Sequence, residues 1–249
     1  LKNTFKAFVG NLKSDGIIFQ NENLEYKGYK YGLSDKSDYY IDELFHGPFE
    51  TEFEIKSKKN NFGKVVFGMP GKHNALNALA AFSIAVKLNL NPKKIINAIE
   101  SFSGIERRFS IITKSPKILI DDYAHHPNEI KSIVDSVKIM YPKKSNLVIF
   151  QPHLFSRTKD FMIEFARALE KFDKIFLLNI YPAREKPIPG IDSTELLKII
   201  KNDNKKIIND ADLIENLEID DSDIIITLGA GDISEKVESI KKLILQNAI

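Results

Sequence analysis

From about Ser110 to the end of the chain, short apolar runs alternate with amphipathic stretches, and this alternation constrains the fold most. The apolar runs are continuous, which is typical of strands buried on both faces of a parallel sheet. The stretches between them have the apolar spacing of helices. The pattern predicts an α/β fold in which helices cover both faces of a mainly parallel sheet. The predicted strands are residues 117–123, 146–152, 174–182, 205–210 and 223–231, and the predicted helices are 126–140, 158–172, 193–202, 211–219 and 233–245.

The earlier part of the chain has a different pattern. Alternating apolar residues on both sides of a polar turn predict a hairpin over Phe49–Met69. An alanine-rich helix is expected over 74–88, and a second over 91–102 with Asn91 as its N-cap. An amphipathic helix over 1–12 and a short strand within 15–23 are expected before them. The change of pattern places a domain boundary within 104–112, and we take 1–108 and 109–249 as the two domains.

Composition excludes several classes of protein. The 36 basic and 34 acidic residues give a net charge of +2, so neither nucleic acid nor an anionic membrane is an expected partner. The chain has no cysteine, which excludes disulfides and thiolate metal sites. No apolar run approaches the ~20 residues of a membrane span, so we expect a cytoplasmic protein. Because Leu1 lies within an apolar helical pattern, we expect the chain to be part of a longer polypeptide.

Polar clusters follow several of the predicted strands. Ligands of parallel α/β sheets bind at the carboxyl ends of the strands, so these clusters mark the expected site. Four of the five histidines lie in or beside the clusters or at the start of the alanine-rich helix. The clusters are "DDYAHHP" (121–127), "QPHLFSRT" (151–158), "NIYPAREKPIPG" (179–190) and "LGAGD" (228–232).

The first cluster has three interpretations. Its two carboxylates and two imidazoles are ligands that zinc or manganese accept, although neighbouring strand residues point to opposite faces and do not converge easily. Alternatively, a carboxylate binds ribose hydroxyls or magnesium-bound water, and an imidazole binds phosphate. The third interpretation is a polar strand end followed by a capped helix. The residues concerned are Asp121, Asp122, His125 and His126.

Two further motifs have both a ligand-binding and a structural interpretation. Asn74 and Asn77 are three residues apart, so both amides face one side of a helix, where they suit the edge of a purine. Asn74 could instead be the helix N-cap. Arg107 and Arg108 are adjacent and point apart, so at most one faces a given phosphate or carboxylate, unless both are surface residues.

The later clusters also have two interpretations each. His153 and Arg157 are four residues apart at a predicted helix start, which favours anions, so they form a candidate carboxylate receptor. A capped, solvated helix start is the alternative. "LGAGD" lacks the full G-x-G-x-x-G pattern, and close backbone packing explains it as well as a bound polar group does.

In this order, "GKHNALNALAA", "GIERRF", "DDYAHHPNEI", "FQPHLFSRT", "YPAREKPIPG" and "GAGDI" resemble the Mur ligases of bacterial cell-wall synthesis. The resemblance runs from about Tyr31 to Asp232. It implies that 1–108 is the latter part of an α/β ATP-binding domain and that 109–249 is a Rossmann-like amino-acid-binding domain. "QPH…SRT" and "YPA.E.P" point to the branch that joins L-alanine to UDP-N-acetylmuramate. The branch that recycles murein tripeptide is the alternative.

The resemblance also implies a role for particular residues. Asn74 and Asn77 would contact adenine, Arg108 the phosphates and Asp122 the ribose. Tyr123 and His125 would border the nucleotide and the reacting groups, so that His125 and Arg108 are the catalytic candidates. The role of His126 is the least defined. The histidine pair is then part of an ATP site with no tightly bound metal of its own. The residues expected to hold the amino acid are His153, Arg157, Tyr181 and Glu185.

The implied reaction uses ATP with Mg²⁺ to phosphorylate the muramoyl carboxylate, and the amine of L-alanine then attacks the acyl phosphate. The chain departs from the family in having no G-x-x-x-x-G-K-[ST] loop, so we expect these residues alone to be inactive. A second departure is Leu154, where many relatives carry arginine. Two hypotheses of another class are a stand-alone nucleotide- or amino-acid-binding module and a metal-dependent phosphohydrolase built on Asp121, Asp122, His125 and His126.

Overall fold

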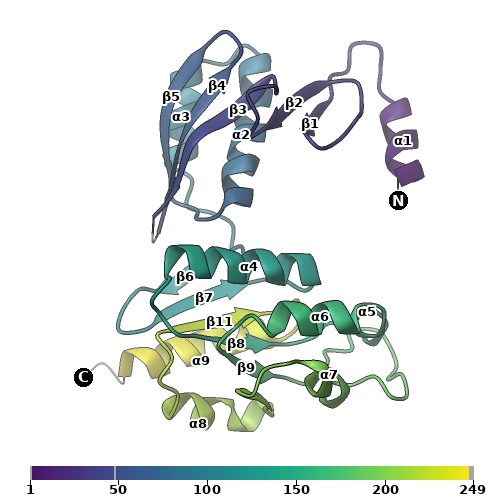
Figure 1. The fold of residues 1–249 in the computed structure, drawn as a ribbon, viewed down its shortest axis with the longest axis vertical. Helices are drawn as coiled ribbons and strands as arrows, with labels where there is room; N and C mark the ends of the chain where they lie inside the picture. The colour runs from purple at the N-terminus through teal and green to yellow at the C-terminus, as the bar shows by residue number, and fades with distance from the viewer. Residues whose placement is uncertain (1, 48, 247–249) are drawn as a thin grey trace. The chain divides into compact units, whose positions relative to one another are not determined.

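The computed structural model describes residues 2–47 and 49–246, and the chain forms two compact units that divide between Ser103 and Gly104. Figure 1 shows the first unit in purple to blue and the second in teal to yellow. Each unit has a sheet and helices of its own, and each is described separately below.

The first unit is built on a five-stranded sheet in the order β1-β2-β3-β4-β5, parallel from β1 to β3 and antiparallel from β3 to β5. The predicted hairpin is β4 and β5. Strands β2 and β3 were not predicted, because β2 has only four residues and a register shift between Asp42 and Phe45 interrupts the alternation of β3. The strands are β1 (Phe19–Asn21), β2 (Tyr29–Gly32), β3 (Tyr39–His46), β4 (Thr51–Ser57) and β5 (Asn61–Phe67).

Helices α1 (Lys2–Gly10), α2 (Lys72–Lys87) and α3 (Pro92–Glu100) complete this unit. The small side chains of α2 allow it to pack closely on the sheet, and its Phe82 is fully buried. In α3, the Asn91 side chain accepts hydrogen bonds from the backbone N–H groups of Lys93 and Lys94, as predicted for an N-cap. Leu1, at the start of the predicted first helix, lies outside the described residues.

The second unit confirms the predicted α/β fold. Its six-stranded sheet has the order β10-β9-β8-β11-β7-β6, and all strands are parallel except β6, an edge strand too short to show a pattern in the sequence. The last strand in the sequence therefore lies between β8 and β7. The strands are β6 (Ser110–Thr113), β7 (Ile118–Asp122), β8 (Asn146–Phe150), β9 (Lys174–Leu177), β10 (Lys205–Ile207) and β11 (Ile224–Leu228).

Helices cover both faces of this sheet (Figure 1). Leu119, Leu147 and Ile225 of successive strands pack in one core with α8 and α9, while Phe150 on the opposite face packs against Phe165 of α6. The helices are α4 (Pro127–Met140), α5 (Phe155–Asp160), α6 (Met162–Leu169), α7 (Ser193–Ile199), α8 (Leu213–Glu218) with the 3₁₀ turn η1 (Asp210–Asp212) before it, and α9 (Ile233–Gln246). The predicted helix 158–172 is two helices, because Phe161 leaves the helical conformation at φ −121° and ψ 22°.

Candidate functional site

The parallel strands of the second unit bring the four predicted clusters to one edge of the sheet. Backbone hydrogen bonds continue past the strand ends: the N–H of Gln151 donates to Leu228 O, and the N–H of Tyr181 donates to Pro152 O. The N–H of Gly229 likewise donates to Asp122 O. The side chains that follow β7, β8, β9 and β11 therefore form one group of neighbours.

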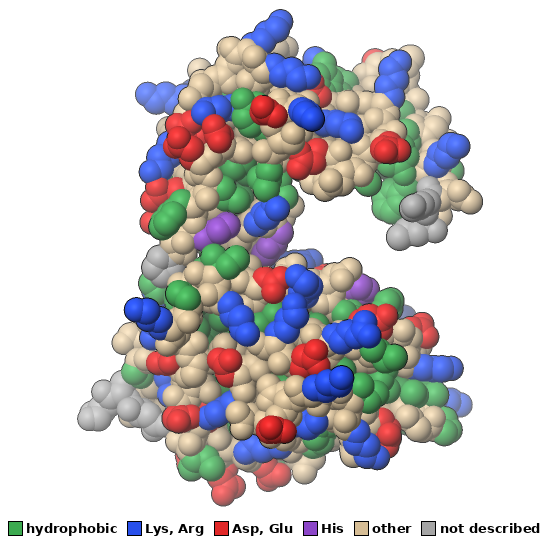
Figure 2. All heavy atoms as spheres, viewed as in Figure 1, with side chains coloured by type: hydrophobic (Ala, Val, Ile, Leu, Met, Phe, Trp, Pro, Cys, Tyr) green, Lys and Arg blue, Asp and Glu red, His purple; other side chains and the backbone are tan. Residues whose placement is uncertain are grey.

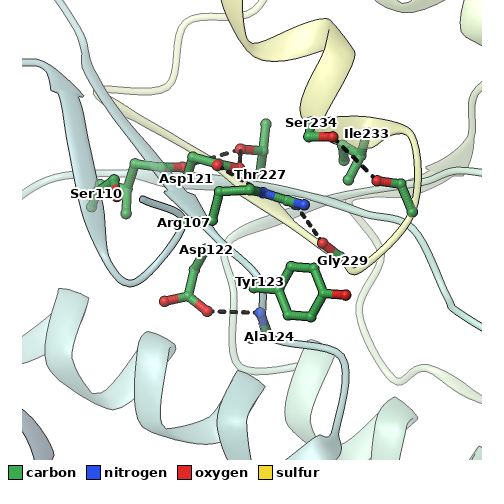
Figure 3. A network of polar contacts seen from close by, with 12 residues as sticks. Arg107, Ser110, Asp121, Asp122, Tyr123, Ala124, Thr227, Gly229, Ile233 and Ser234 are labelled. Carbon is green, nitrogen blue, oxygen red and sulfur yellow. Dashed lines mark hydrogen bonds and ion pairs between the residues drawn. The ribbon is translucent and has the colours of Figure 1, made fainter. Parts of the chain in front are cut away.

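Arg107, which the sequence analysis did not single out over Arg108, is the centre of a polar network (Figure 3). Its Nε donates to Asp121 Oδ2 at 3.1 Å, and its Nη2 donates to Gly229 O at 2.5 Å. Asp121 is 3% exposed, and its Oδ1 accepts a hydrogen bond from the Thr227 hydroxyl at 2.6 Å. The guanidinium also lies 5.0 Å from the centre of the Tyr123 ring. Arg107 thus ties the strand-β7 end to the loop after β11.

Asp122 is also buried, but it is held by backbone groups. Its Oδ2 accepts from Phe109 N at 2.6 Å and its Oδ1 from Ala124 N at 2.7 Å. Burial nevertheless raises the pKa of Asp122 to about 6, because the loss of water outweighs these two donors and the nearby charge of Arg108. Arg108 itself is exposed. The carboxyl group of Asp122 therefore changes its charge close to neutral pH.

This raised pKa predicts a specific pH dependence of stability. The native state keeps the Asp122 proton up to about pH 6, whereas the unfolded chain loses it near 3.8, so folding becomes less favourable as pH rises through that window. A difference of about 2 pKa units corresponds to roughly 3 kcal/mol. Between pH 4 and 7, we expect the free energy of unfolding of the wild-type protein to fall by roughly 3 kcal/mol more than that of Asp122→Asn. Urea unfolding at each pH measures it, and parallel curves for the two proteins would contradict it.

His126 has a structural role as the N-cap of α4. Its Nδ1 accepts a hydrogen bond from Asn128 N at 3.3 Å, and Glu129 Oε2 in turn accepts from His126 N at 3.1 Å, which forms a capping box. The ring packs edge-on against Phe161, 4.8 Å away. The sequence contained the signal for this cap, since Pro127 and Glu129 occupy the first and third helical positions.

The four residues of the metal interpretation consequently do different things. Asp121 pairs with Arg107, Asp122 accepts backbone N–H groups, and His126 caps a helix. Within residues 2–47 and 49–246, no group of three or more histidine, aspartate or glutamate side chains is placed to hold a metal ion.

His125 and His153 face each other across the strand ends, with their ring centres 6.2 Å apart. His153 stacks on Tyr181 at 5.6 Å, and its Nδ1 lies 3.5 Å from Nη1 of Arg157. Burial, followed by electrostatic interactions with Arg157 and His125, lowers the pKa of His153. The structure therefore brings together three of the predicted amino-acid-binding residues, His153, Arg157 and Tyr181, and adds His125 to them.

Glu185, the fourth predicted amino-acid-binding residue, is engaged by the start of α5. Its carboxylate accepts hydrogen bonds from the hydroxyl and the backbone N–H of Ser156. These bonds, the hydroxyl first, hold the pKa of Glu185 below its usual range. Glu185 anchors the loop that follows Tyr181 to the segment that carries Arg157.

Gln151 is a site residue that the sequence analysis did not single out. Its Nε2 donates to Asp232 Oδ1 at 2.6 Å, and its Oε1 accepts from Ile233 N at 3.0 Å. A Cβ on Gly231 would lie 2.3 Å from Gln151 Oε1 and 2.7 Å from Cγ of Tyr181. Of the two interpretations of "LGAGD", close backbone packing is therefore present.

The two asparagines of α2 lie in the first unit. Asn74 is buried and donates from Nδ2 to Pro70 O at 2.8 Å, whereas Asn77 is exposed. The N-cap of α2 is Gly71, without a side-chain cap bond, so the interpretation of Asn74 as the cap was wrong.

Positive and negative side chains interleave over the face of the molecule shown in Figure 2. None of the helices in the described parts of the chain is long and apolar enough to cross a membrane.

Two family models and several curated proteins match the chain. The family model described as "Mur ligase, glutamate ligase domain" matches residues 107–231, and "Mur ligase middle domain" matches 3–85. A UDP-N-acetylmuramate–L-alanine ligase of Christiangramia forsetii is 41% identical over 249 residues, which are all of this chain and 55% of that protein. The ligase of the same name from Flavobacterium psychrophilum is 43% identical over 97% of this chain and 54% of its own length.

Solved structures show the same fold. The UDP-N-acetylmuramate–alanine ligase of Thermotoga maritima superposes with a TM-score of 0.77 at 23% identity, covering 100% of this chain and 55% of its own. A MurF ligase from Thermotoga maritima in complex with ADP gives a TM-score of 0.66 at 16% identity, covering 88% of this chain and 49% of its own. The chain spans about half the length of the curated relatives that it matches.

Proposed function

Because the chain belongs to the Mur ligase family, we propose that it serves the ATP-dependent joining of L-alanine to UDP-N-acetylmuramate in peptidoglycan precursor synthesis. The observation that carries this proposal is the 41% identity, along the whole chain, to a ligase named for these substrates. In this proposal residues 1–108 belong to the ATP-binding domain, and residues 109–249 form the amino-acid-binding domain.

Each unit is assigned its own nucleotide contacts, which are Asn74 and Asn77 in the first unit and Arg108, Asp122 and Tyr123 in the second. Arg108 supports this assignment because it is exposed, whereas its neighbour Arg107 is held by Asp121 and Gly229. Each Asp122 oxygen accepts one backbone N–H and has a further lone pair for a ribose hydroxyl. The ADP complex of a MurF ligase with the same fold is consistent with nucleotide binding.

Mg²⁺ accompanies ATP in phosphoryl transfer, where it offsets the charge of the phosphates. We assign it no ligand from this chain. Asp121 is held by Arg107 and Thr227, and the described residues offer no group of three acidic or imidazole side chains for a cation.

The amino acid is assigned to the group formed by His153, Arg157, Tyr181 and Glu185. Arg157 is half-buried and has guanidinium N–H groups in a fork that matches a carboxylate. Glu185 orders the start of α5, on which Arg157 lies, through Ser156. Leu154 is the N-cap of α5 at φ 74° and brings no charge, so Arg157 is the principal anchor for the alanine carboxylate.

The proposed function is tested with a chimera in which this chain replaces the matching segment of the Christiangramia forsetii ligase. Release of phosphate from ATP should then depend on both L-alanine and UDP-N-acetylmuramate. A folded chimera that turns over murein tripeptide and not L-alanine would assign the chain to the recycling branch. A folded chimera that binds nucleotide or L-alanine without turnover would instead support the stand-alone binding module.

In an active chimera, Arg157→Ala should raise the KM for L-alanine about ten- to a hundredfold. The reason is that a charge-assisted hydrogen bond to a carboxylate contributes roughly 1.5–3 kcal/mol. The KM for ATP should stay within about twofold. Arg167→Ala, an exposed arginine of α6, is the matched control and should change neither constant. An effect on ATP in place of L-alanine would contradict the assignment of this strand end.

A further inference from the structure

The two facing imidazoles of the second unit carry their protons on different nitrogens. An imidazole nitrogen that contacts a pure donor must offer its lone pair, and one that contacts a pure acceptor must carry a hydrogen. Nδ1 of His153 contacts a donor, whereas Nδ1 of His125 contacts two acceptors, so the tautomer of each ring follows from its contacts.

His153 is the member that presents an N–H. Its Nδ1 lies 3.5 Å from Nη1 of Arg157, and a guanidinium only donates. Nδ1 therefore holds the lone pair, and the hydrogen of the neutral ring is on Nε2. The lowered pKa of His153 agrees with a neutral ring, since burial and the charge of Arg157 both disfavour the imidazolium.

His125 is the opposite case. Its Nδ1 lies 2.9 Å from the carbonyl oxygen of Tyr123 and 3.8 Å from Oε2 of Glu129, and both atoms only accept. Nδ1 therefore carries the hydrogen, and Nε2 holds a free lone pair. The same Glu129 oxygen accepts the backbone N–H of His125 at 3.0 Å, which fixes the residue in this position.

We propose that Nε2 of His125 is the proton acceptor for the amine that attacks in the ligation, while His153 holds the carboxylate end of the same amino acid through its Nε2–H beside Arg157. This inference rests on the proposed function. The roles do not interchange, because the His153 lone pair is turned toward Arg157 and the His125 N–H is turned toward Tyr123 and Glu129.

The proton and bond changes balance as follows. The ammonium group of L-alanine gives one proton to Nε2 of His125, which becomes imidazolium. The nitrogen lone pair then attacks the acyl carbon, the C–N bond forms, and the bond from that carbon to the phosphate oxygen breaks. A second proton leaves the nitrogen with the departing phosphate as hydrogenphosphate. His125 afterwards releases its proton to water.

The charged and titratable groups around His125 are few. Tyr123 and Glu129 lie on its own segment, with the Tyr123 ring edge-on at 5.3 Å, and His153 faces it from the segment after β8. Arg157 and Glu185 lie behind His153. Of these groups, Glu129 is the anion next to His125, and it positions the ring by accepting the backbone N–H and lying beside Nδ1.

The tautomers are tested directly on the 249-residue chain by nitrogen-detected NMR of the imidazole rings. At pH 7.5 we expect protonated Nδ1 for His125 and protonated Nε2 for His153. Arg157→Met should remove the preference of His153 and leave that of His125 unchanged. The same tautomer on both rings would overturn the inference, whether or not the chain takes part in a ligase.

The catalytic role is tested in the active chimera. Asparagine retains a donor for the Tyr123 carbonyl but accepts no proton, so His125→Asn should lower kcat about 10²- to 10⁴-fold with little change in the KM for L-alanine. This deficit should shrink as pH rises, since more of the alanine amine is then already neutral. Added imidazole should restore part of the activity of His125→Ala.

Glu129→Gln separates charge from structure. Glutamine also forms a capping box, so the melting temperature should stay close to that of the wild type. In nitrogen-detected NMR the preference of His125 for protonated Nδ1 should weaken, because a glutamine amide can present a donor as well as an acceptor to this nitrogen. An active wild-type chimera in which His125→Asn keeps kcat within about threefold at every pH would refute the proton-acceptor role and leave the proposed function standing.

Discussion

Arg107→Met is expected to lower the free energy of unfolding by about 3–5 kcal/mol, the usual cost of removing one partner from a buried ion pair. The Asp121 side chain is 5% exposed, and without Arg107 the Thr227 hydroxyl is the remaining partner that the structure gives its carboxylate. The carbonyl of Gly229 loses a donor at the same time. Urea unfolding followed by circular dichroism at pH 7.5 measures the change.

Two variants show whether the buried charge is the cause. Arg107→Met combined with Asp121→Asn should be more stable than Arg107→Met alone, because the amide is neutral and its oxygen still accepts from Thr227. Lys131→Met breaks an exposed pair with Asp135 and should cost less than about 1 kcal/mol. If Arg107→Met costs no more than Lys131→Met, the network of Figure 3 does not stabilise the unit.

Gly229→Ala should lower the free energy of unfolding by about 2–5 kcal/mol, the sum of backbone strain and overpacking. The residue has φ 146°, and a Cβ there would lie 2.7 Å from the backbone oxygen of Gln151. That oxygen cannot rotate away as the end of a long side chain can. Because Gly229 lies in the loop after β11, the change should also weaken the hydrogen bond from Arg107.

Other glycines of the chain provide a graded control for this variant. Gly190 has φ 75° and open space around its Cβ position, so Gly190→Ala should show strain alone, about 1–2 kcal/mol. Gly68 has neither a positive φ nor a close neighbour, and Gly68→Ala should be within about 0.5 kcal/mol of the wild type. Equal costs at positions 229 and 190 would show that the contact with Gln151 relaxes without penalty.

The sequence was most informative where local patterns and tertiary structure agree. The continuous apolar runs of β7, β8 and β11 predict a parallel sheet because both of their faces are buried, as the structure confirms. The capped start of α3 was equally clear. Strands β2, β3 and β6 were missed because they are short, irregular or paired at an edge, so that non-local pairing and not local pattern defines them.

The candidate site shows the same division. Clustering at the strand ends was predictable from parallel topology, since carboxyl ends share an edge. The sequence did not predict which of two adjacent residues has which role. Arg107 and Phe109 both have positive φ, so the alternation expected of an extended segment does not apply to Arg107 and Arg108. His126 is the N-cap of α4, whereas His125 precedes the helix. Only the role of His126 had a signature in the neighbouring sequence.

The position of β11 at the centre of the sheet has a consequence for synthesis of the protein. Strands β7 and β8 leave the ribosome long before their common neighbour, and the hydrogen bond between Thr227 and Asp121 joins residues 106 positions apart. Until residues 224–228 emerge, β6–β7 and β8–β10 are two separate half-sheets with apolar edges. Closure of such long-range contacts is slow, and the open edges are prone to aggregate. The nascent unit is therefore most exposed to aggregation in the interval before its last strand is synthesised.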